Sequence, residues 1–136
     1  MEKWQEYWIA CIEGISCRRK WEIRCGIDTP EELYYIEETR KNLKLDITDE
    51  EVRIIAGSRK TRNWKEEYKH LQEKEIHFVC RSEAEYPKKL SEIAGAPYAL
   101  YWIGKMPVAD AFSVAIVGAR RCTSYGEKMT LEFAET

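Results

Sequence analysis

The chain has 136 residues, of which 44% are hydrophobic and 34% charged, and its formal net charge is −2. This composition can supply a hydrophobic core, which argues against wholesale disorder, and no apolar run reaches the roughly 18 residues of a membrane-spanning helix. The near-neutral charge excludes a globally basic nucleic-acid binder, so any contact with nucleic acid must come from a local basic patch.

The N-terminal sequence and the cysteines indicate the compartment. The opening residues MEKWQE lack the basic and then apolar regions of a signal peptide, and the five cysteines include no Cys-x-x-Cys pair. An odd number of unpaired cysteines argues against a disulfide framework or a zinc site and is typical of reduced thiols. We therefore expect a cytoplasmic protein with no membrane segment and no metal or other cofactor.

The first part of the chain has a helical pattern. Aromatic and apolar residues at steps of three and four predict an amphipathic helix; they are Trp4, Tyr7, Trp8 and Cys11. Gly14 is expected to end that helix, and a second helix through Trp21 is expected to end near Gly26, which suits a C-terminal cap.

Two capping patterns predict the next helix starts. Thr29 is placed as an N-cap, with Pro30 at the first helical position and Glu32 three residues after the cap. The segment DITDEEVRII has the same capping pattern, with Thr48 as N-cap and the Glu51 side chain expected to accept from the Thr48 amide. These patterns predict a bundle of short helices.

The second part of the chain changes period. A helix is predicted over about 63–74, and short β-rich runs predict strands over 76–80 and 99–104, with a short helix through Leu90 between them. The segment SVAIVG, residues 113–118, is apolar on both alternating faces. This predicts a strand buried between two helical layers.

A helix follows that strand from about Ser124, so a strand, a glycine turn and a helix start occur in sequence. This is the geometry that holds phosphate groups, because free amides and the helix dipole favour an anion. Gly118 would allow a sharp turn, and Arg120 would bind a phosphate through two parallel hydrogen bonds. Thr123 or Ser124 would cap the helix, and Glu127 would complete a capping box with Ser124. The alternative is a plain βα turn with two solvated arginines.

The loop departs from the common nucleotide-binding fingerprints. Gly-x-Gly-x-x-Gly would need a glycine at position 120, where an arginine stands, and the Gly-Lys-Ser/Thr of a P-loop is also missing.

The segment AIVGARRCTSYGEKM resembles the signature of the DNA-processing protein A (DprA/Smf) family, a strand that ends in Gly-Ser/Ala-Arg followed by Thr-x-Tyr-Gly. Upstream, EYPKKLSEIAGAPYALYWIG is similar to that family's Tyr-Pro-x-x-Leu and Pro-x-x-Leu-Tyr arrangement, and residues 12–34 are similar to its helical leader. The resemblance is to the N-terminal portion of the family only.

The resemblance implies a fold and two domains. We expect an α/β protein with a helical leader domain of the SAM or helix-hairpin-helix kind over residues 1–62. The start of an extended Rossmann-like, doubly wound domain would follow over residues 63–136. Because the family's domain continues further, we expect this Rossmann-like domain to be truncated and any homodimer to depend on the missing C-terminal part.

The resemblance also implies a function without catalysis. The family binds and protects single-stranded DNA and helps load the RecA recombinase during natural transformation and recombination. The implied phosphate-binding residues are Gly118, Ala119, Arg120, Arg121, Thr123, Ser124, Tyr125 and Gly126. Ala119 stands where the family motif often has serine, so one hydroxyl donor is lost while the backbone amide remains.

Two other functions stay open at this stage. One is a Rossmann-like nucleotide-binding enzyme similar to the LOG-type phosphoribohydrolases, although their Gly-Gly-x-Gly-Thr run does not occur in the sequence. The other is an inactive, truncated fragment.

Several further residues are candidate sites, each with a structural alternative. The run CIEGIS, residues 11–16, approximates a helix-hairpin-helix motif, which contacts DNA phosphates, and the basic run Arg18-Arg19-Lys20 follows it. The alternative is a plain helical turn without a DNA contact. SRKTRNWK, residues 58–65, combines basic side chains with Trp64, a mixture that suits a phosphate backbone with stacked bases. The alternative is a solvated linker whose tryptophan packs in the core. The remaining candidates have weaker signals and favour structural or incidental roles: His70, His77, Cys122, Tyr98, Tyr101 and Trp102.

Overall fold

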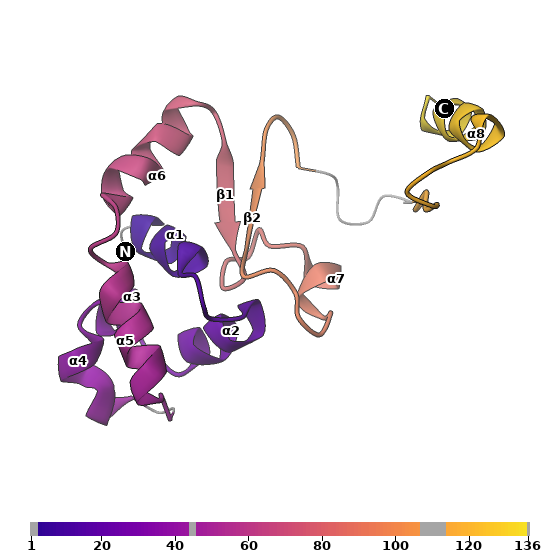
Figure 1. Ribbon diagram of the computed structural model, residues 1–136. Helices are drawn as coiled ribbons and strands as arrows, with labels where there is room; N and C mark the ends of the chain where they lie inside the picture. Colours follow the sequence, from indigo (N-terminus) through magenta and orange to yellow (C-terminus); the bar gives the residue numbers. More distant parts are fainter. Residues whose placement is uncertain (1–2, 44–45, 107–113, 136) are drawn as a thin grey trace.

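The computed structural model describes residues 3–43, 46–106 and 114–135. Figure 1 shows a group of short helices beside a small two-stranded sheet, with one further helix, α8, lying apart from them. This combination of helices and strands is compatible with the expected α/β class. The Rossmann-like architecture, the SAM or helix-hairpin-helix type of the leader and the division at residues 62/63 stay predictions.

The two N-terminal helices follow the sequence pattern. Helix α1 spans Lys3–Cys11 and α2 spans Cys17–Cys25. The turn between them contains Gly14 at a φ of 84°, a left-handed conformation that favours glycine. Ser16 caps α2 by accepting a hydrogen bond from the Arg19 amide, and the Gly26 amide closes the helix on the Glu22 and Ile23 carbonyls, as predicted.

The capping patterns also form. Helix α3 spans Pro30–Tyr34, α4 spans Ile36–Thr39, the 3₁₀ turn η1 spans Arg40–Asn42 and α5 spans Asp49–Ser58. Glu32 accepts from the Thr29 amide at 2.9 Å. Glu51 accepts from the Thr48 amide at 2.9 Å and donates its own amide to the Thr48 hydroxyl oxygen at 3.2 Å. The starts of α3 and α5 are therefore fixed by residues within one turn of them.

The next elements form the sheet and its flank. Helix α6 spans Trp64–Glu73, β1 spans His77–Cys80, α7 spans Lys88–Ser91 and β2 spans Ala99–Trp102. The two strands pair antiparallel, with His77 opposite Trp102 and Cys80 opposite Ala99. The predicted strands and the short helix between them are thereby confirmed, and the only pairing among the described residues is antiparallel rather than the parallel kind expected of a doubly wound sheet.

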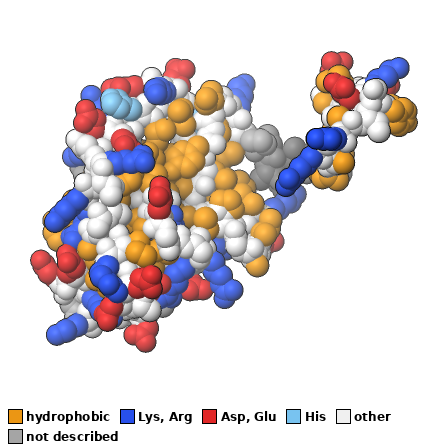
Figure 2. Space-filling model, viewed as in Figure 1, with side chains coloured by type: hydrophobic (Ala, Val, Ile, Leu, Met, Phe, Trp, Pro, Cys, Tyr) orange, Lys and Arg blue, Asp and Glu red, His pale blue; other side chains and the backbone are white. Residues whose placement is uncertain are grey.

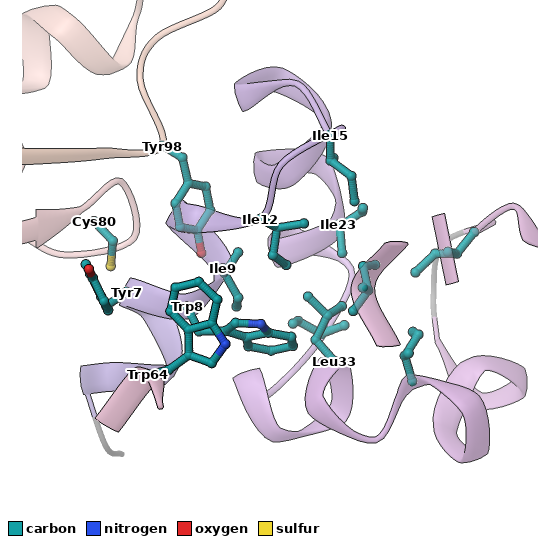
Figure 3. Close-up of a cluster of buried hydrophobic side chains, with 14 of the residues drawn as sticks. Tyr7, Trp8, Ile9, Ile12, Ile15, Ile23, Leu33, Trp64, Cys80 and Tyr98 are labelled. Atoms are coloured by element: carbon teal, nitrogen blue, oxygen red, sulfur yellow. The ribbon is translucent and has the colours of Figure 1, made fainter. Parts of the chain in front are cut away.

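One hydrophobic core joins the helices to the sheet. Its members come from helices α1 to α6, from β1, from the residue before β2 and from connecting turns: Tyr7, Trp8, Ile9, Ile12, Ile15, Ile23, Ile27, Leu33, Ile36, Ile47, Ile55, Trp64, Phe78, Cys80 and Tyr98. Figure 3 labels Trp8 and Trp64 among the side chains of this core. The described core therefore crosses the expected boundary at residues 62/63.

The indoles of Trp8 and Trp64 are both buried, and both donate a hydrogen bond to the last residue of α5. The Nε1 of Trp8 donates to the Ser58 hydroxyl oxygen at 2.9 Å, and the Nε1 of Trp64 donates to the Ser58 carbonyl at 2.9 Å. Because a buried indole N–H needs an acceptor, Ser58 fixes the place where α1, α5 and α6 meet.

The strand predicted over 113–118 is not formed by its described residues, 114–118. Val114 and Val117 are each 89% exposed, and Ser113 lies outside the described residues. A strand that is apolar on both faces is stable only between neighbours that cover both faces, and the described residues supply none there. Helix α8, Ser124–Ala134, follows as predicted, and none of its residues is buried.

No helix within the described ranges is long and apolar enough to span a bilayer.

Candidate nucleic-acid interface

The start of α8 is built by a local cap. Thr123 has extended backbone angles, and its hydroxyl oxygen accepts a hydrogen bond from the Gly126 amide at 3.2 Å. Of the two predicted caps, Thr123 is therefore confirmed. The box between Ser124 and Glu127 is wrong, because Ser124 is already the first helical residue and the Glu127 amide donates to the Thr123 carbonyl at 2.9 Å.

Gly118 plays a smaller part in this structure than expected. It is absent from the glycines with positive φ, and a Cβ built on it would meet nothing within 4 Å. The predicted sharp turn without space for a Cβ is therefore not seen at this position. A Cβ on Gly126 would lie 3.5 Å from the capping hydroxyl of Thr123, which is an ordinary van der Waals contact.

Arg120 and Arg121 are exposed, and neither has a hydrogen bond or ion pair within the described part of the chain. The eight other arginines all have an acidic or carbonyl partner. Those partners are Glu22 for Arg18, Glu51 for Arg19, Glu6 for Arg24, Asp49 for Arg40, the Asp49 carbonyl for Arg53, Glu37 for Arg59, Glu67 for Arg62 and the Ser91 carbonyl for Arg81.

The side chains of the basic run Arg18-Arg19-Lys20 therefore have partners within the described residues. Arg19 reaches across to Glu51 at 2.6 Å, and this hydrogen bond raises the pKa of the guanidinium. Lys20 is 7% exposed, its Nζ donates to the Ala10 carbonyl at 2.6 Å, and burial lowers its pKa. These side chains close the end of α1 and join α2 to α5, which leaves few free charges for a phosphate backbone.

The segment 58–65 also has a structural role. Arg59 donates to the Tyr34 carbonyl and to Glu37, and Arg62 lies over the Trp64 ring at 5.8 Å. Trp64 itself is only 6% exposed, so it has no open face on which a base could stack. The alternative in which this tryptophan packs in the core is confirmed.

The hairpin over residues 11–16 packs on α5. A Cβ built on Gly14 would lie 3.4 Å from the Ile54 side chain, so this glycine also allows a close approach. A groove of about 530 Å³ adjoins the hairpin and is lined by side chains that include Glu13, Ile54 and Arg62. DNA contact by this hairpin stays a prediction.

The remaining candidates have no arrangement for metal or nucleophilic chemistry. Within the described ranges, no group of three or more His, Cys, Asp or Glu side chains could hold a metal ion. The His77 ring stacks on Trp102 at 5.1 Å, and Tyr98 is 2% exposed in the core. The Cys122 thiol is exposed beside the two free arginines.

A buried polar cluster joins the helices to the sheet, and no pattern in the sequence predicted it. Glu6 lies at its centre, with Arg24 Nε at 2.7 Å from Oε1 and the Tyr98 hydroxyl at 2.5 Å from Oε2. Nearby, Glu83 accepts from the Cys80 amide at 2.9 Å and pairs with Lys3 at 2.8 Å. The named groups all have partners within the cluster, which indicates a structural role.

The cysteine of this cluster is unsuited to nucleophilic chemistry. Cys80 is fully buried, and burial raises the pKa of its thiol to about 12. The thiol is therefore protonated at neutral pH, whereas a nucleophile must be a thiolate.

One comparison with known proteins gives a match, and it covers the C-terminal part of the chain. Residues 77–136 match the family model described as DNA recombination-mediator protein A. The match includes β1, β2 and α8, together with every residue of the expected phosphate loop. No curated protein and no solved structure matches the chain.

Proposed function

We propose, from the match of residues 77–136 to the family model of DNA recombination-mediator protein A, that this chain binds single-stranded DNA through the segment 118–126. The family assignment indicates a role in DNA processing during recombination. The finer statements, which concern the strandedness of the DNA, the residues that contact it and the recombinase partner, are the proposal.

The observation that carries the proposal is the difference between the arginines. Eight arginines are held by partners within the folded body, whereas Arg120 and Arg121 are exposed without one in the described part of the chain. Both lie in the family-matched segment, two or three residues before the Thr123 cap of α8. A guanidinium that is free of carboxylates can bind a phosphate without first breaking an ion pair.

The chemistry of this segment supports binding without base recognition. A guanidinium grips the phosphate group, and the amides at the start of α8 favour the same negative charge. Phosphates carry no sequence information, so binding is tolerant of sequence and weakens steeply with salt. Tyr125, 74% exposed, is available to stack on an unpaired base, which a duplex does not offer.

The partner in recombination would be a RecA-type recombinase, loaded onto the DNA strand that this protein covers and protects, during natural transformation or recombination. No catalytic step is part of the proposal. Release of free base from nucleoside monophosphates by the purified chain would contradict this, and would favour the phosphoribohydrolase alternative.

The test is a titration of fluorescently labelled single-stranded oligonucleotides at several salt concentrations. We expect Arg120→Ala to lower affinity for every sequence and to reduce the slope of log K against log salt by about 0.7, the value for one lost phosphate contact on a single strand. Arg18→Ala is the matched control, because Arg18 is exposed but paired with Glu22 at 3.1 Å. An unchanged slope in Arg120→Ala would overturn the proposal.

A further inference from the structure

The antiparallel ladder fixes which backbone groups of β1 point away from β2. The Arg81 amide donates to the Tyr98 carbonyl at 2.9 Å, in register with the four residue pairs of the two strands. Hydrogen-bonded and non-hydrogen-bonded pairs alternate along such a ladder. Every second residue back from Arg81 therefore bonds to β2. The residues between them, Phe78 and Cys80, turn their amides and carbonyls to the outer edge of β1.

One of these two residues is capped by its own chain, and the other is not. Glu83 accepts from the Cys80 amide at 2.9 Å, and its own amide donates to the Cys80 carbonyl at 3.0 Å. The Phe78 amide and carbonyl have no hydrogen-bond partner within residues 3–43, 46–106 and 114–135. A free amide and carbonyl on the edge of a strand are the groups with which an added strand pairs.

A groove of about 810 Å³ follows this edge. Its lining includes the four consecutive residues 76–79, and successive side chains of a strand point to opposite faces, so the groove contacts the edge between the two faces. Tyr68 and Gln72 line it from α6, and Trp102 and Ile103 line it from the end of β2. Figure 2 shows hydrophobic side chains gathered over the region of β1 and β2.

The charges of the groove are acidic in sum. Its acidic and basic lining residues are Lys3, Glu75, His77 and Glu85. Lys3 is already paired with Glu83 at 2.8 Å, so these two charges cancel. Glu75 and Glu85 are exposed, and neither carboxylate has a partner in the part of the chain that the structure describes. Two exposed lysines adjoin the lining in sequence without being part of it: Lys74 and Lys105.

We propose that the outer edge of β1 binds an extended segment of a partner protein, which joins the sheet as a third strand and places a basic side chain against Glu75 or Glu85. The Phe78 amide and carbonyl would each make one main-chain hydrogen bond to that strand. Alternate side chains of the added strand would meet Tyr68 on one face of the sheet and His77 on the other.

The charge of the groove selects this kind of partner. Two carboxylates without counterions repel a phosphate backbone and attract lysine or arginine. None of the lining residues lies in the segment 118–126, to which the DNA contact is assigned. The test uses no DNA, so failure of either proposal leaves the other standing.

Amide hydrogen exchange followed by NMR tests whether the edge is free. In the protein alone, we expect the Phe78 amide to exchange at least about tenfold faster than the Val79 amide, which bonds to β2. A Phe78 amide as slow as that of Val79 would contradict the proposal, because the protein's own chain or a second copy would then already cover the edge.

A synthetic hexapeptide of sequence Lys-Val-Thr-Val-Lys-Val, acetylated, amidated and labelled with fluorescein, is the probe for binding. Fluorescence anisotropy is expected to give a Kd below about 1 mM, and the unlabelled peptide should slow exchange of the Phe78 amide. An added strand bonds through every second residue only. N-methylation of the first, third and fifth residues, or of the second, fourth and sixth, should therefore abolish binding in one of the two peptides and not in both.

The charge contact is tested in the peptide and in the protein. Replacing both lysines of the peptide by glutamate, or Glu75→Gln with Glu85→Gln in the protein, should weaken binding at least about tenfold. Glu66→Gln with Glu73→Gln is the matched control, because both are exposed residues of α6 outside the groove lining. The proposal fails if the lysine peptide does not bind at 1 mM, if both N-methylated peptides bind equally, or if the two double variants have the same affinity.

Discussion

The hydroxyl group of Tyr98 donates a 2.5 Å hydrogen bond to Oε2 of Glu6, although 92 residues separate the two side chains in sequence. Tyr98 is 2% exposed and Glu6 is 3% exposed, and the other carboxylate oxygen of Glu6 is held by Arg24 at 2.7 Å. Removing any one donor leaves a buried carboxylate with an incomplete shell. The contact therefore ties the first helix to the family-matched part of the chain.

Tyr98→Phe tests this contact. The substitution keeps the ring and removes one donor to the buried carboxylate, so we expect the free energy of unfolding to fall by about 1–3 kcal/mol. Urea denaturation followed by tryptophan fluorescence measures the change. Tyr125→Phe is the matched control, because Tyr125 is 74% exposed, and it should change stability by less than about 0.5 kcal/mol. Equal effects of the two substitutions would contradict the role of the buried hydroxyl.

The ion pair between Glu51 and Arg19 predicts a dependence of stability on pH. Hydrogen bonds from Arg19 lower the pKa of the Glu51 carboxyl from 4.5 to about 2. A carboxyl with a lowered pKa in the folded state stabilises the protein above its unfolded pKa, and loses that contribution as pH falls from about 4.5 through about 2.

Glu51→Gln should therefore destabilise the protein at pH 7 and have a steadily smaller effect below pH 4.5. Chemical denaturation at pH 7, 5 and 3 measures the difference. Glu50→Gln is the control, since Glu50 is an exposed neighbour on the same helix turn. A difference between Glu51→Gln and the parent that grows as pH falls would contradict the sign of the shift.

Burial of Cys80 predicts a large difference in thiol reactivity. With its pKa raised to about 12, this thiol has roughly a thousandfold less thiolate at pH 8 than an ordinary cysteine. We expect iodoacetamide to label the exposed Cys17, Cys25 and Cys122 first, and Cys80 only after denaturation. Mass spectrometry of digested protein measures each rate. Labelling of Cys80 at the rate of the exposed thiols in the native protein would contradict this.

Ala119→Ser tests the proposed DNA contact by addition. The hydroxyl supplies one further donor beside Arg120, so affinity for single-stranded DNA should rise by about two- to tenfold. The salt slope should not change, because no charge is added. Ala134→Ser, at the other end of α8, is the matched control. If both serines have the same effect on affinity, the gain does not come from the loop.

The helices of the first half were predictable because their determinants are local. The hydrogen bonds between Thr48 and Glu51, and between Glu32 and the Thr29 amide, join groups three residues apart. Residues this close in sequence meet in nearly any fold that forms the helix. The same is true of the Thr123 cap of α8, which the sequence identified as one of two alternatives.

The candidate site was predictable only in part. The sequence identified the basic runs, and the family model matches residues 77–136, a range that includes the segment around Arg120. The sequence could not show that Arg19 would be held by Glu51 or Arg59 by Glu37, since those partners are 32 and 22 residues away. Only tertiary structure decides which charges are neutralised and which stay free for a ligand.

The strand expected over 113–118 shows the other limit. Its apolar residues predict that both faces of the strand are covered, but they do not predict which elements cover them. In the structure, residues 114–118 are exposed. The sequence alone determined where the capped helices α3 and α5 begin, because hydrogen bonds over three or four residues do not depend on the rest of the fold. Tertiary structure alone decided which buried groups meet and which surfaces remain uncovered, because burial is a property of neighbours that are distant along the chain.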